Sequence, residues 1–563
     1  MKTALTGVVI VSLTMIALPW GPVLAGGLNR FRPSTLTAGG ENDDNLYTPL
    51  DFEAAAASHP DADARVLVSR CRFAPFANDV SLYSAFRVNV SDAIVEDTPF
   101  QFADGTQCFN PQNESNIVVN PTNPNNVLTS ANEYRLDGDE VYVSMDGGHT
   151  WNNVVLPGWT SSTGGSGVFA RMSSCGDPVL AFAPDGTAYF SGLVCNTNRA
   201  SLSDLGFSGV ALASSHDGGG TWSAPRMVSF SDSVVIFNDK DWITVGPDGT
   251  VYVTWTRFKV TKSGFGESPI VVSTSTDGGN SWSDWVTVSD SSHPFDQGAV
   301  PLVAPDGTLY VAYEGATPGN GYAGAAIIVA RSTDGGHSFT NSEVARVFDD
   351  FNCYPHNIAQ FRPTLTGEQF RINSFPSFAV DPTTGQLVIS WADDQANPSC
   401  GYEHSNRFLL GATSNQVKLI TSFNGLNWST PRVITSGASD KVFPAVGANA
   451  GRIVVSYYTR AFSPGTNDCR AEVLDTSTNN LIIVGGPVCL DYALRSSTDN
   501  FATETRLTHQ SSNPYITFAG SFIGDYTGAA VTSSGAVFAA WADFRGNPGV
   551  TSANMDIDVA FDY

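Results

Sequence analysis

Short runs of alternating hydrophobic and polar residues, separated by turn residues, make up most of this chain. Three of the turns share a Pro-Asp-Gly-Thr core, at Ala183–Tyr189, Gly246–Tyr252 and Ala304–Tyr310. Proline presets the backbone of such a turn and glycine supplies a positive φ, so each motif predicts a tight connection between two strands. Weaker copies of the turn lie at Asp381–Gly385, Asn449–Gly451 and Ser533–Gly535.

A large aromatic residue stands six positions after the turn glycine in five copies: Trp255, Tyr313, Trp391, Tyr457 and Trp541. A shared offset indicates one hairpin repeated along the chain, with the aromatic side chain at the same place in each copy. Seven such hairpins can be counted, starting near residues 117, 178, 241, 298, 376, 442 and 526. We name the two strands of each hairpin A and B.

A second repeat, Ser-x-Asp-Gly-Gly-x-Ser/Thr followed by an aromatic residue, is interleaved with the first. Its copies lie at Ser144–Trp151, Ser215–Trp222, Ser275–Trp282 and Ser332–Phe339. The aspartate can accept hydrogen bonds from nearby backbone amides and the glycines provide positive φ, so each copy predicts a turn between a strand C and a strand D. We call these the Asp-Gly-Gly turns.

Units of four antiparallel strands repeated along a chain predict an all-β fold, a single β-propeller. Seven blades are favoured and six remain an alternative. The last unit, ending at Asp556–Tyr563, has a C strand and no D strand after it. We therefore expect a propeller over residues 64–563, closed by an N-terminal strand such as Ala64–Ser69.

The N-terminus is typical of a secretory signal peptide. Lys2 precedes an apolar stretch from Ala4 to Leu18, and small residues near Ala25 offer a cleavage site. Residues 1–25 are expected to be removed, which predicts secretion to the extracellular space or periplasm; an uncleaved membrane anchor is the alternative. Residues 26–63, rich in Gly, Ala and Asp, are expected to form a flexible arm. No later segment is long and apolar enough to span a bilayer.

The formal net charge of the 563-residue chain is −25. Such a surface repels phosphate backbones and anionic lipids, so we expect neither nucleic acid nor a membrane as partner. The eight cysteines fit an oxidising compartment and predict disulfides between sequence neighbours. The expected pairs are Cys71–Cys108, Cys175–Cys195, Cys353–Cys400 and Cys469–Cys489.

Topology separates two faces of the predicted ring. A–B and C–D turns lie on one face, while the longer B–C and D–A connections lie on the other, where ligands usually bind. Charged residues gather at this second mouth. At the starts of A strands stand Glu114, Asp177, Asp239, Lys240, Asp241, Asp296, Asp440, Lys441 and Asp525. At the ends of B strands stand Arg135, Arg257, Glu314, Asp393, Asp394, Arg460, Asp543 and Arg545, with Tyr458 and Tyr526 nearby.

The Asp-Gly-Gly turns resemble the Asp boxes, or BNR repeats, of the sialidase superfamily, over roughly residues 110–563. The resemblance implies a propeller, of six blades in sialidases, and a site with an arginine triad for the substrate carboxylate, a tyrosine nucleophile activated by glutamate, and an aspartate acid/base. By position, it assigns Tyr458 as nucleophile, Glu314 as its base and Asp241 as general acid. Substrate binding is assigned to Arg135, Arg257, Arg460, Arg545 and Asp543.

The leading hypothesis is therefore a secreted, monomeric glycoside hydrolase, sialidase-like, acting on an acidic or complex glycan or polysaccharide. A noncatalytic propeller that binds an extracellular glycan or protein is an alternative, and a polysaccharide lyase is another. No cofactor is expected. The carboxylates around the central axis are suitable ligands for calcium, so a structural calcium ion is left open as an alternative.

Overall fold

The structure, a computed structural model, describes the chain from Val80 to Phe561 with gaps. The described residues are 80–87, 90–97, 100–101, 107–108, 112–133, 138–196, 207–233, 235–261, 264–316, 325–348, 354–355, 363–368, 370–394, 413–463, 471–475, 480–484, 489–514, 522–544 and 555–561. The signal peptide, the arm and the segment Ala64–Ser69 lie outside these residues and stay predictions.

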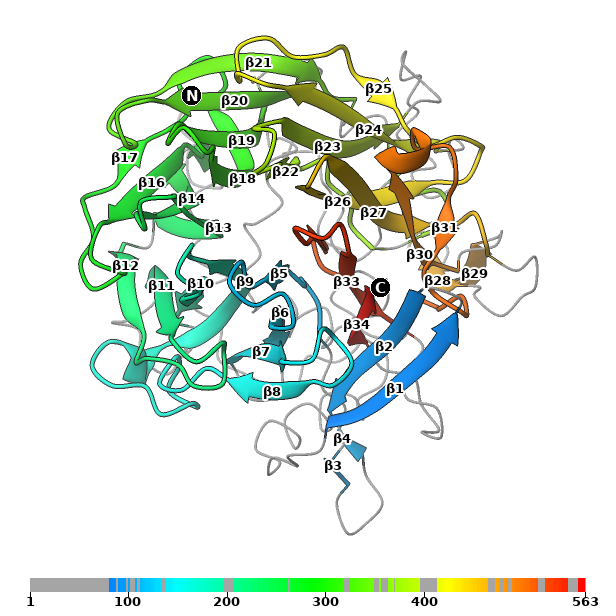
Figure 1. The fold of residues 1–563 in the computed structure, drawn as a ribbon, viewed down its shortest axis with the longest axis horizontal. Coiled ribbons are helices and arrows are strands. Elements are labelled where there is room, and N and C mark those ends of the chain that lie inside the picture. The colour runs from blue at the N-terminus through cyan, green and yellow to red at the C-terminus, as the bar shows by residue number, and fades with distance from the viewer. Residues whose placement is uncertain are drawn as a thin grey trace, which may run out of the picture.

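Seven antiparallel sheets lie in a ring around a common axis, so the favoured blade number is confirmed (Figure 1). Strand A of each blade is innermost and strand D outermost. Blade 1 contains β5 (Ile117–Val119), β6 (Val127–Glu133), β7 (Gly138–Ser144) and β8 (Asn152–Val155). Blade 2 contains β9 (Ser173–Phe182), β10 (Ala188–Cys195), β11 (Ser208–Ser215) and β12 (Arg226–Ser231). Blade 3 contains β13 (Ile236–Val245), β14 (Val251–Thr261), β16 (Ile270–Ser275) and β17 (Val286–Thr287), and β15 (Gly264–Glu267) pairs with β14.

The second half of the ring repeats this order. Blade 4 contains β18 (Phe295–Val303), β19 (Leu309–Ala316), β20 (Ala326–Ser332) and β21 (Thr340–Arg346). Blade 5 contains β22 (Ser377–Val380), β23 (Leu387–Asp394), β24 (Asn415–Ser422) and β25 (Arg432–Val433). Blade 6 contains β26 (Lys441–Asn449), β27 (Arg452–Thr459), β30 (Asp491–Ser496) and β31 (Thr505–Arg506).

Blade 7 combines the two ends of the described chain. β32 (Gly528–Val531), β33 (Val537–Asp543) and β34 (Asp556–Phe561) are its A, B and C strands. β2 (Val90–Asp97) pairs antiparallel with β34 as strand D, and β1 (Val80–Arg87) adds a fifth strand outside it (Figure 1). The edge of β34 is therefore covered by a strand from far earlier in the chain, which closes the ring.

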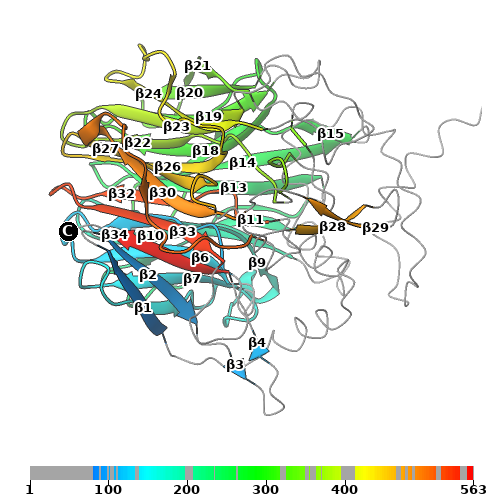
Figure 2. The ribbon, with the colours of Figure 1, turned by 90° about the vertical axis from the view of Figure 1, so that its right-hand side faces the viewer.

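Two short hairpins and two 3₁₀ turns complete the described secondary structure. The hairpins are β3 (Phe100–Gln101) with β4 (Gln107–Cys108), and β28 (Ala471–Asp475) with β29 (Asn480–Val484); both project from the body of the ring (Figure 2). The 3₁₀ turns are η3 (Phe169–Arg171) and η6 (Ser497–Asp499). No helix among the described residues is long and apolar enough to cross a membrane.

The two sequence repeats form the turns that their residues predict. In blade 3, the Ser275 hydroxyl accepts a hydrogen bond from the Gly279 amide at 2.9 Å and donates one to Asp277 at 2.8 Å. Asp277 in turn accepts from the amide and hydroxyl of Ser281. The same contacts recur in blades 1, 2 and 4. These turns therefore satisfy their own polar groups, as expected of a structural element.

The aromatic residues that follow the A–B turns fill the core between blades. Trp255, Tyr313, Trp391, Tyr457 and Trp541 are at most 1% exposed and belong to the apolar clusters between neighbouring sheets. One predicted disulfide, Cys175–Cys195, joins β9 to its partner β10 with its Cα atoms 5.8 Å apart. Each of the other three predicted pairs includes a cysteine whose side chain lies outside the described part of the chain.

Candidate active site

Several A strands enter the ring through a residue with left-handed backbone. Asp177 and Lys240 have φ values of 58° and 48°, and Gly298 takes the matching place in blade 4 with φ of 67°. The A–B pairing shifts register at this point in blades 3 and 4, so the strand bulges there. Positive φ is costly for a residue other than glycine and is retained mostly where function requires it. Glu114, before blade 1, has φ of 60°.

The strained residues belong to a group of buried side chains at the inner ends of five blades. We call this group the inner cluster; it consists of Glu114, Asp177, Asp239, Lys240, Arg371, Asp525 and Tyr526. Its members lie in the loops before the A strands of blades 1, 5 and 7 or within the first half of β9 and β13. They therefore meet at the end of the ring opposite the A–B and Asp-Gly-Gly turns, as the sequence predicts for a ligand site.

Lys240 links three of these elements. Its Nζ lies 3.5 Å from Asp177 Oδ1, and its backbone amide donates to Asp177 Oδ2 at 3.1 Å. The ammonium also lies 3.4 Å from the ring centroid of Tyr526 and 4.9 Å from that of Trp242. Lys240 is only 3% exposed, so its charge is held by one carboxylate and two aromatic faces.

Arg371 and Asp525 form the second ion pair. The Arg371 guanidinium donates through both Nε and Nη2 to the two oxygens of Asp525, a bidentate arrangement. It also stacks on Phe522, with its Cζ 4.6 Å from the ring centroid. Asn373 donates to the Asp525 carbonyl at 3.1 Å, which fixes the loop before blade 7 against the loop before blade 5.

Glu114 is the acidic group with the least support from cations. Burial, and then the charges of Asp177 and Asp525, raise its pKa to about 8, and only Lys240 and a 2.8 Å hydrogen bond from Asn132 oppose this. Burial also raises the pKa of Asp177, where Lys240 acts against it. A carboxyl that stays protonated near neutral pH can donate a proton, and a neighbouring carboxylate paired with a cation can accept one.

Two polar atoms of the inner cluster have no hydrogen-bond partner among the described residues: Asp239 Oδ2 and Lys240 Nζ. Burial raises the pKa of Asp239 well above its ordinary value. Buried polar atoms are nearly always hydrogen-bonded in folded proteins, so such atoms mark a place where a polar ligand or water is needed.

The structure places the nominated general acid, Asp241, beside the inner cluster. Asp241 lies on β13 and is fully buried, and it accepts a hydrogen bond from the Ser191 hydroxyl of blade 2. Burial and the charge of Asp177 raise its pKa well above the ordinary value. Asp241 lies between two blades, and its role as a proton donor to a ligand stays a prediction.

Tyr458 does not face the inner cluster. It lies within β27, 2% exposed, and its hydroxyl donates to the Ala542 carbonyl of blade 7 at 2.7 Å. Its ring packs on Phe443 and Tyr492, and burial raises its pKa well above the ordinary value. A phenol that is buried, protonated and already bonded is poorly placed to attack a sugar. Glu314, on β19 of blade 4, is also buried, at 2% exposure.

Two of the four nominated arginines are described. Arg257 lies on blade 3 with its Cζ 5.0 Å above the Trp285 ring, and Arg460 follows the B strand of blade 6, so an arginine triad stays a prediction. Arg135 and Arg545 lie outside the described residues. Asp543 is buried at the end of β33 and accepts from the Trp541 indole at 3.3 Å.

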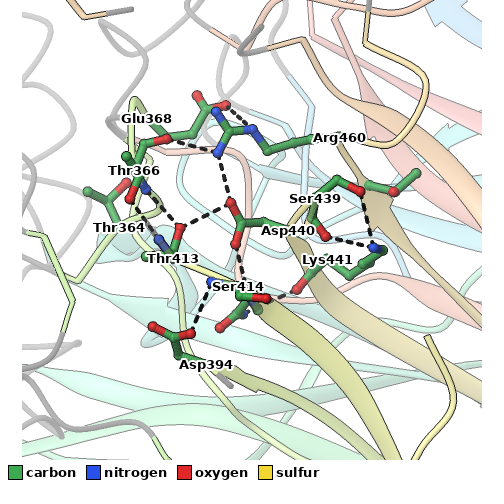
Figure 3. Close-up of polar contacts among 12 residues, drawn as sticks. Thr364, Thr366, Glu368, Asp394, Thr413, Ser414, Ser439, Asp440, Lys441 and Arg460 are labelled. Atoms are coloured by element: carbon green, nitrogen blue, oxygen red, sulfur yellow. Dashed lines mark hydrogen bonds and ion pairs between the residues drawn. The ribbon is translucent and has the colours of Figure 1, made fainter. Parts of the chain in front are cut away.

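Arg460 belongs to a separate polar network between blades 5 and 6 (Figure 3). Its guanidinium donates to Asp440 at 2.9 Å and to the Thr366 carbonyl at 2.8 Å, and lies 3.6 Å from Glu368. Asp440 also accepts from Thr413 and from the Asn415 amide. These contacts hold the loop before blade 5 against blade 6, which gives Arg460 a structural role in this structure.

Sequence reasoning overlooked Arg371 and Asn373. Both lie shortly before the A strand of blade 5, close to where charged residues stand in the other blades, and this placement is the signal that could have identified them. Among the described residues, no group of three His, Cys, Asp or Glu side chains could hold a metal ion. The structural calcium that the sequence left open as an alternative therefore gains no support in this part of the chain.

No family model and no curated protein matches the chain. Several solved structures do match it. A protein of unknown function from Dyadobacter fermentans is 12% identical with a TM-score of 0.40, covering 69% of this chain and 94% of its own. An α-L-arabinofuranosidase from Fusarium graminearum is 12% identical with a TM-score of 0.41, covering 69% and 94%. Trypanosoma rangeli sialidase is 13% identical with a TM-score of 0.37, covering 66% and 56%.

These likenesses concern the fold. Four-stranded antiparallel sheets in a ring, with Ser-x-Asp-Gly-Gly turns joining strands C and D, give this chain a sialidase-like β-propeller fold with seven blades.

Proposed function

We propose that the protein is a glycoside hydrolase whose chemistry takes place at the inner cluster. The observation that supports this most directly is Glu114, a carboxyl whose pKa burial raises to about 8, beside an Asp177 carboxylate held by Lys240. Two carboxyl groups in contrasting environments are the common requirement for hydrolysing a glycosidic bond, because one must donate a proton and the other must accept one.

In this proposal Glu114 donates its proton to the glycosidic oxygen as the bond to the anomeric carbon breaks. Asp177 accepts a proton from the water whose oxygen bonds to that carbon. Asp239 Oδ2, which has no hydrogen-bond partner among the described residues, would hold a hydroxyl group of the sugar, and Lys240 Nζ, ion-paired with Asp177 but likewise without a hydrogen bond, would donate to another. Tyr526, half-buried with its ring against Lys240, forms an aromatic wall for the sugar ring.

The charge of the inner cluster favours an uncharged sugar over a sugar acid. Arg371 is committed to Asp525 through both oxygens, and Lys240 to Asp177. Neither cation is therefore free to pair with the carboxylate of a sugar acid, and the remaining acidic groups of the cluster, Glu114 and Asp239, are carboxyls whose raised pKa suits them to hydrogen-bond hydroxyl groups. An acidic glycan, the sequence-based expectation, would need cations from residues such as Arg135 and Arg545. Hydrolases of both sugar classes, a sialidase and an α-L-arabinofuranosidase, are named among the similar solved structures.

The direct experiment is a screen of the purified protein with neutral and acidic aryl glycosides and oligosaccharides, with product analysis. Glu114→Gln and Asp177→Asn should each lower the turnover that is found by at least roughly 100-fold, while the exposed Glu343→Gln on β21 should leave it unchanged. Saturable binding without products would instead identify a noncatalytic binder, and unsaturated products absorbing in the ultraviolet would identify a lyase. Turnover that survives both cluster substitutions would overturn the proposal.

A further inference from the structure

A hollow polar groove lies on the face opposite the inner cluster, between blades 1 and 2. Its volume is about 420 Å³, within the range of roughly 300–1,000 Å³ that is usual for ligand pockets. Its walls are the A–B turns of blades 1 and 2, the Asp-Gly-Gly turn of blade 2 and Met145 from the Asp-Gly-Gly turn of blade 1. The lining residues include Asn120, Asn123, Met145, Asp185, Thr187 and His216. We call it the interblade groove.

The groove exists because one side chain is shorter than its counterparts. In each of blades 1 to 4, one residue of strand B pairs with the first serine of the Asp-Gly-Gly turn. The next residue along strand B is a tyrosine in blades 2, 3 and 4: Tyr189, Tyr252 and Tyr310. In blade 1 that position is Leu128, because Val127 pairs with Ser144. A leucine lacks the phenol, so it cannot reach as far toward the neighbouring blade.

The tyrosines show what fills this space elsewhere. The Tyr310 hydroxyl donates to the Asn424 carbonyl in the turn of blade 5 at 3.1 Å. A Cβ atom on Gly278 of blade 3 would lie 3.4 Å from the Tyr189 hydroxyl. Leu128 instead packs close to the backbone of the blade 2 turn: a Cβ atom on Gly219 of that turn would lie 2.7 Å from the Leu128 Cδ2 atom. The outer part of the space between blades 1 and 2 is thus left to polar side chains.

The polar groups of the groove are held in fixed positions. Asn126, at its base, donates to the Gly218 and Ser144 carbonyls at 2.9 and 3.2 Å, and its Oδ1 accepts from Asn120. His216 Nδ1 lies 3.2 Å from the Thr187 hydroxyl, and the His216 ring is exposed. Fixed donors and acceptors around a cavity of this size suit a ligand that presents both kinds of group.

The lining also selects against charged ligands. It contains no lysine or arginine, and hydrogen bonds from Thr187 and from Thr221 lower the pKa values of Asp185 and Asp217 respectively. Both are therefore carboxylates at neutral pH and repel anions. They are also committed to those threonine groups, which leaves them poorly placed to coordinate a cation. Met145, 53% exposed at the rim, offers an apolar surface for carbon-bound hydrogens.

We propose that the interblade groove is a binding site for a neutral sugar unit, distinct from the inner cluster and on the opposite face of the ring. An amide- and hydroxyl-lined cavity with an apolar rim matches a molecule whose edges carry hydroxyl groups and whose faces are hydrocarbon. Such a site would hold a glycan chain near the protein whether or not the inner cluster is catalytic.

The test is ligand-observed NMR titration of the full chain with cellobiose, maltose and arabinobiose, and with N-acetylneuraminic acid as the anionic comparison. Leu128→Tyr should fill the groove as tyrosine does in three other blades and weaken binding of the neutral disaccharide at least tenfold. His216→Ala, on the exposed rim, should weaken it severalfold without touching the core. Thr276→Ala, at the matching place in the turn of blade 3, is the control and should have no effect.

Neither Leu128→Tyr nor His216→Ala should change turnover of any small aryl glycoside that the native protein hydrolyses, which separates the groove from the inner cluster. Three results would overturn the assignment: no saturable binding of any neutral disaccharide, binding unchanged in folded Leu128→Tyr and in His216→Ala, or stronger binding of the anionic sugar.

Discussion

The inner cluster shows how burial can set the chemistry of single residues. Glu114, Asp177 and Asp239 are all nearly inaccessible, and burial is the first cause of the raised pKa in each. They differ in their counterions, because only Asp177 has a lysine ammonium within 4 Å. The positive φ of Glu114, Asp177 and Lys240 adds backbone strain to this desolvation. Both costs fall on the residues to which we assign the reaction.

Glu114→Gln should lower turnover by roughly 10²–10⁴-fold, the usual contribution of a general acid. In the native protein, kcat/KM should fall as pH rises through about 8, because Glu114 then loses its proton. Its folded pKa lies above its unfolded value, so the contribution of Glu114 to stability is fully present below about 4.5 and is lost as pH rises to about 8, by at most roughly 1.4 kcal/mol per pH unit.

The glutamine variant has no proton to lose at this position, so thermal melts at pH 5 and pH 9 provide the check. Glu114→Gln should gain stability relative to the native protein at pH 9 and show little difference at pH 5. Equal melting shifts at the two pH values would argue against a protonated Glu114.

Lys240→Met should destabilise the protein by about 3–5 kcal/mol, because it leaves Asp177 buried without its cation. The double variant Lys240→Met/Asp177→Asn should recover part of that loss, since it removes both charges together. Urea unfolding of the two single variants and the double variant measures the coupling between the pair. A double variant as unstable as the sum of the two singles would mean that the residues act independently.

At the scale of elements, the sequence predicts the strands well and their side-chain directions less well. The A–B and C–D turns carry local signals, since Pro-Asp-Gly and Asp-Gly-Gly fix the backbone by themselves. The starts of A strands depend on bulges, as at Lys240, where the strand begins at Ile236 and shifts register before Trp242. Tyr458 was assigned to the mouth because it lies near the end of a B strand, and in the structure β27 continues to Thr459, so Tyr458 is still a residue of the sheet. No pattern of single residues marks where such a strand ends.

The Asp-Gly-Gly turns should support stability and not catalysis. Ser275→Ala removes the acceptor of the buried Gly279 amide and should cost about 1–3 kcal/mol. Turnover measured well below the melting temperature should be unchanged, because the turn lies on the face opposite the inner cluster. Thr276→Ala, an exposed neighbour in the same turn, is the matched control. A selective loss of turnover in Ser275→Ala would contradict the separation of the two faces.

On the scale of the whole molecule, the ring depends on a strand contributed from outside the repeats. β2 pairs with β34 over Ser91–Val95, and β1 covers β2. The sequence predicts such a strand because the last unit lacks one, but many N-terminal segments have alternating patterns. Pairing between distant segments depends on the geometry of the closed ring, so composition alone cannot select Val90–Asp97. The inner cluster shares this dependence, because its residues come from five blades.

Removal of residues 1–97 should open blade 7 and expose the edge of β34. We expect this truncation to lower the melting temperature and to produce oligomers through edge pairing. Removal of residues 1–79, which retains β1 and β2, is the control and should remain monomeric. Light scattering after size-exclusion chromatography distinguishes the two. A stable monomer from the longer truncation would show that β2 is dispensable.

The pairing of β2 with β34 also bears on the timing of folding. The partner of Val90–Asp97 is β34, which follows the other six blades in the chain, so blade 7 cannot assemble until all of them have been synthesised. An incomplete chain therefore presents an unfinished sheet for most of its synthesis, when chaperones or a translocation channel can still engage it.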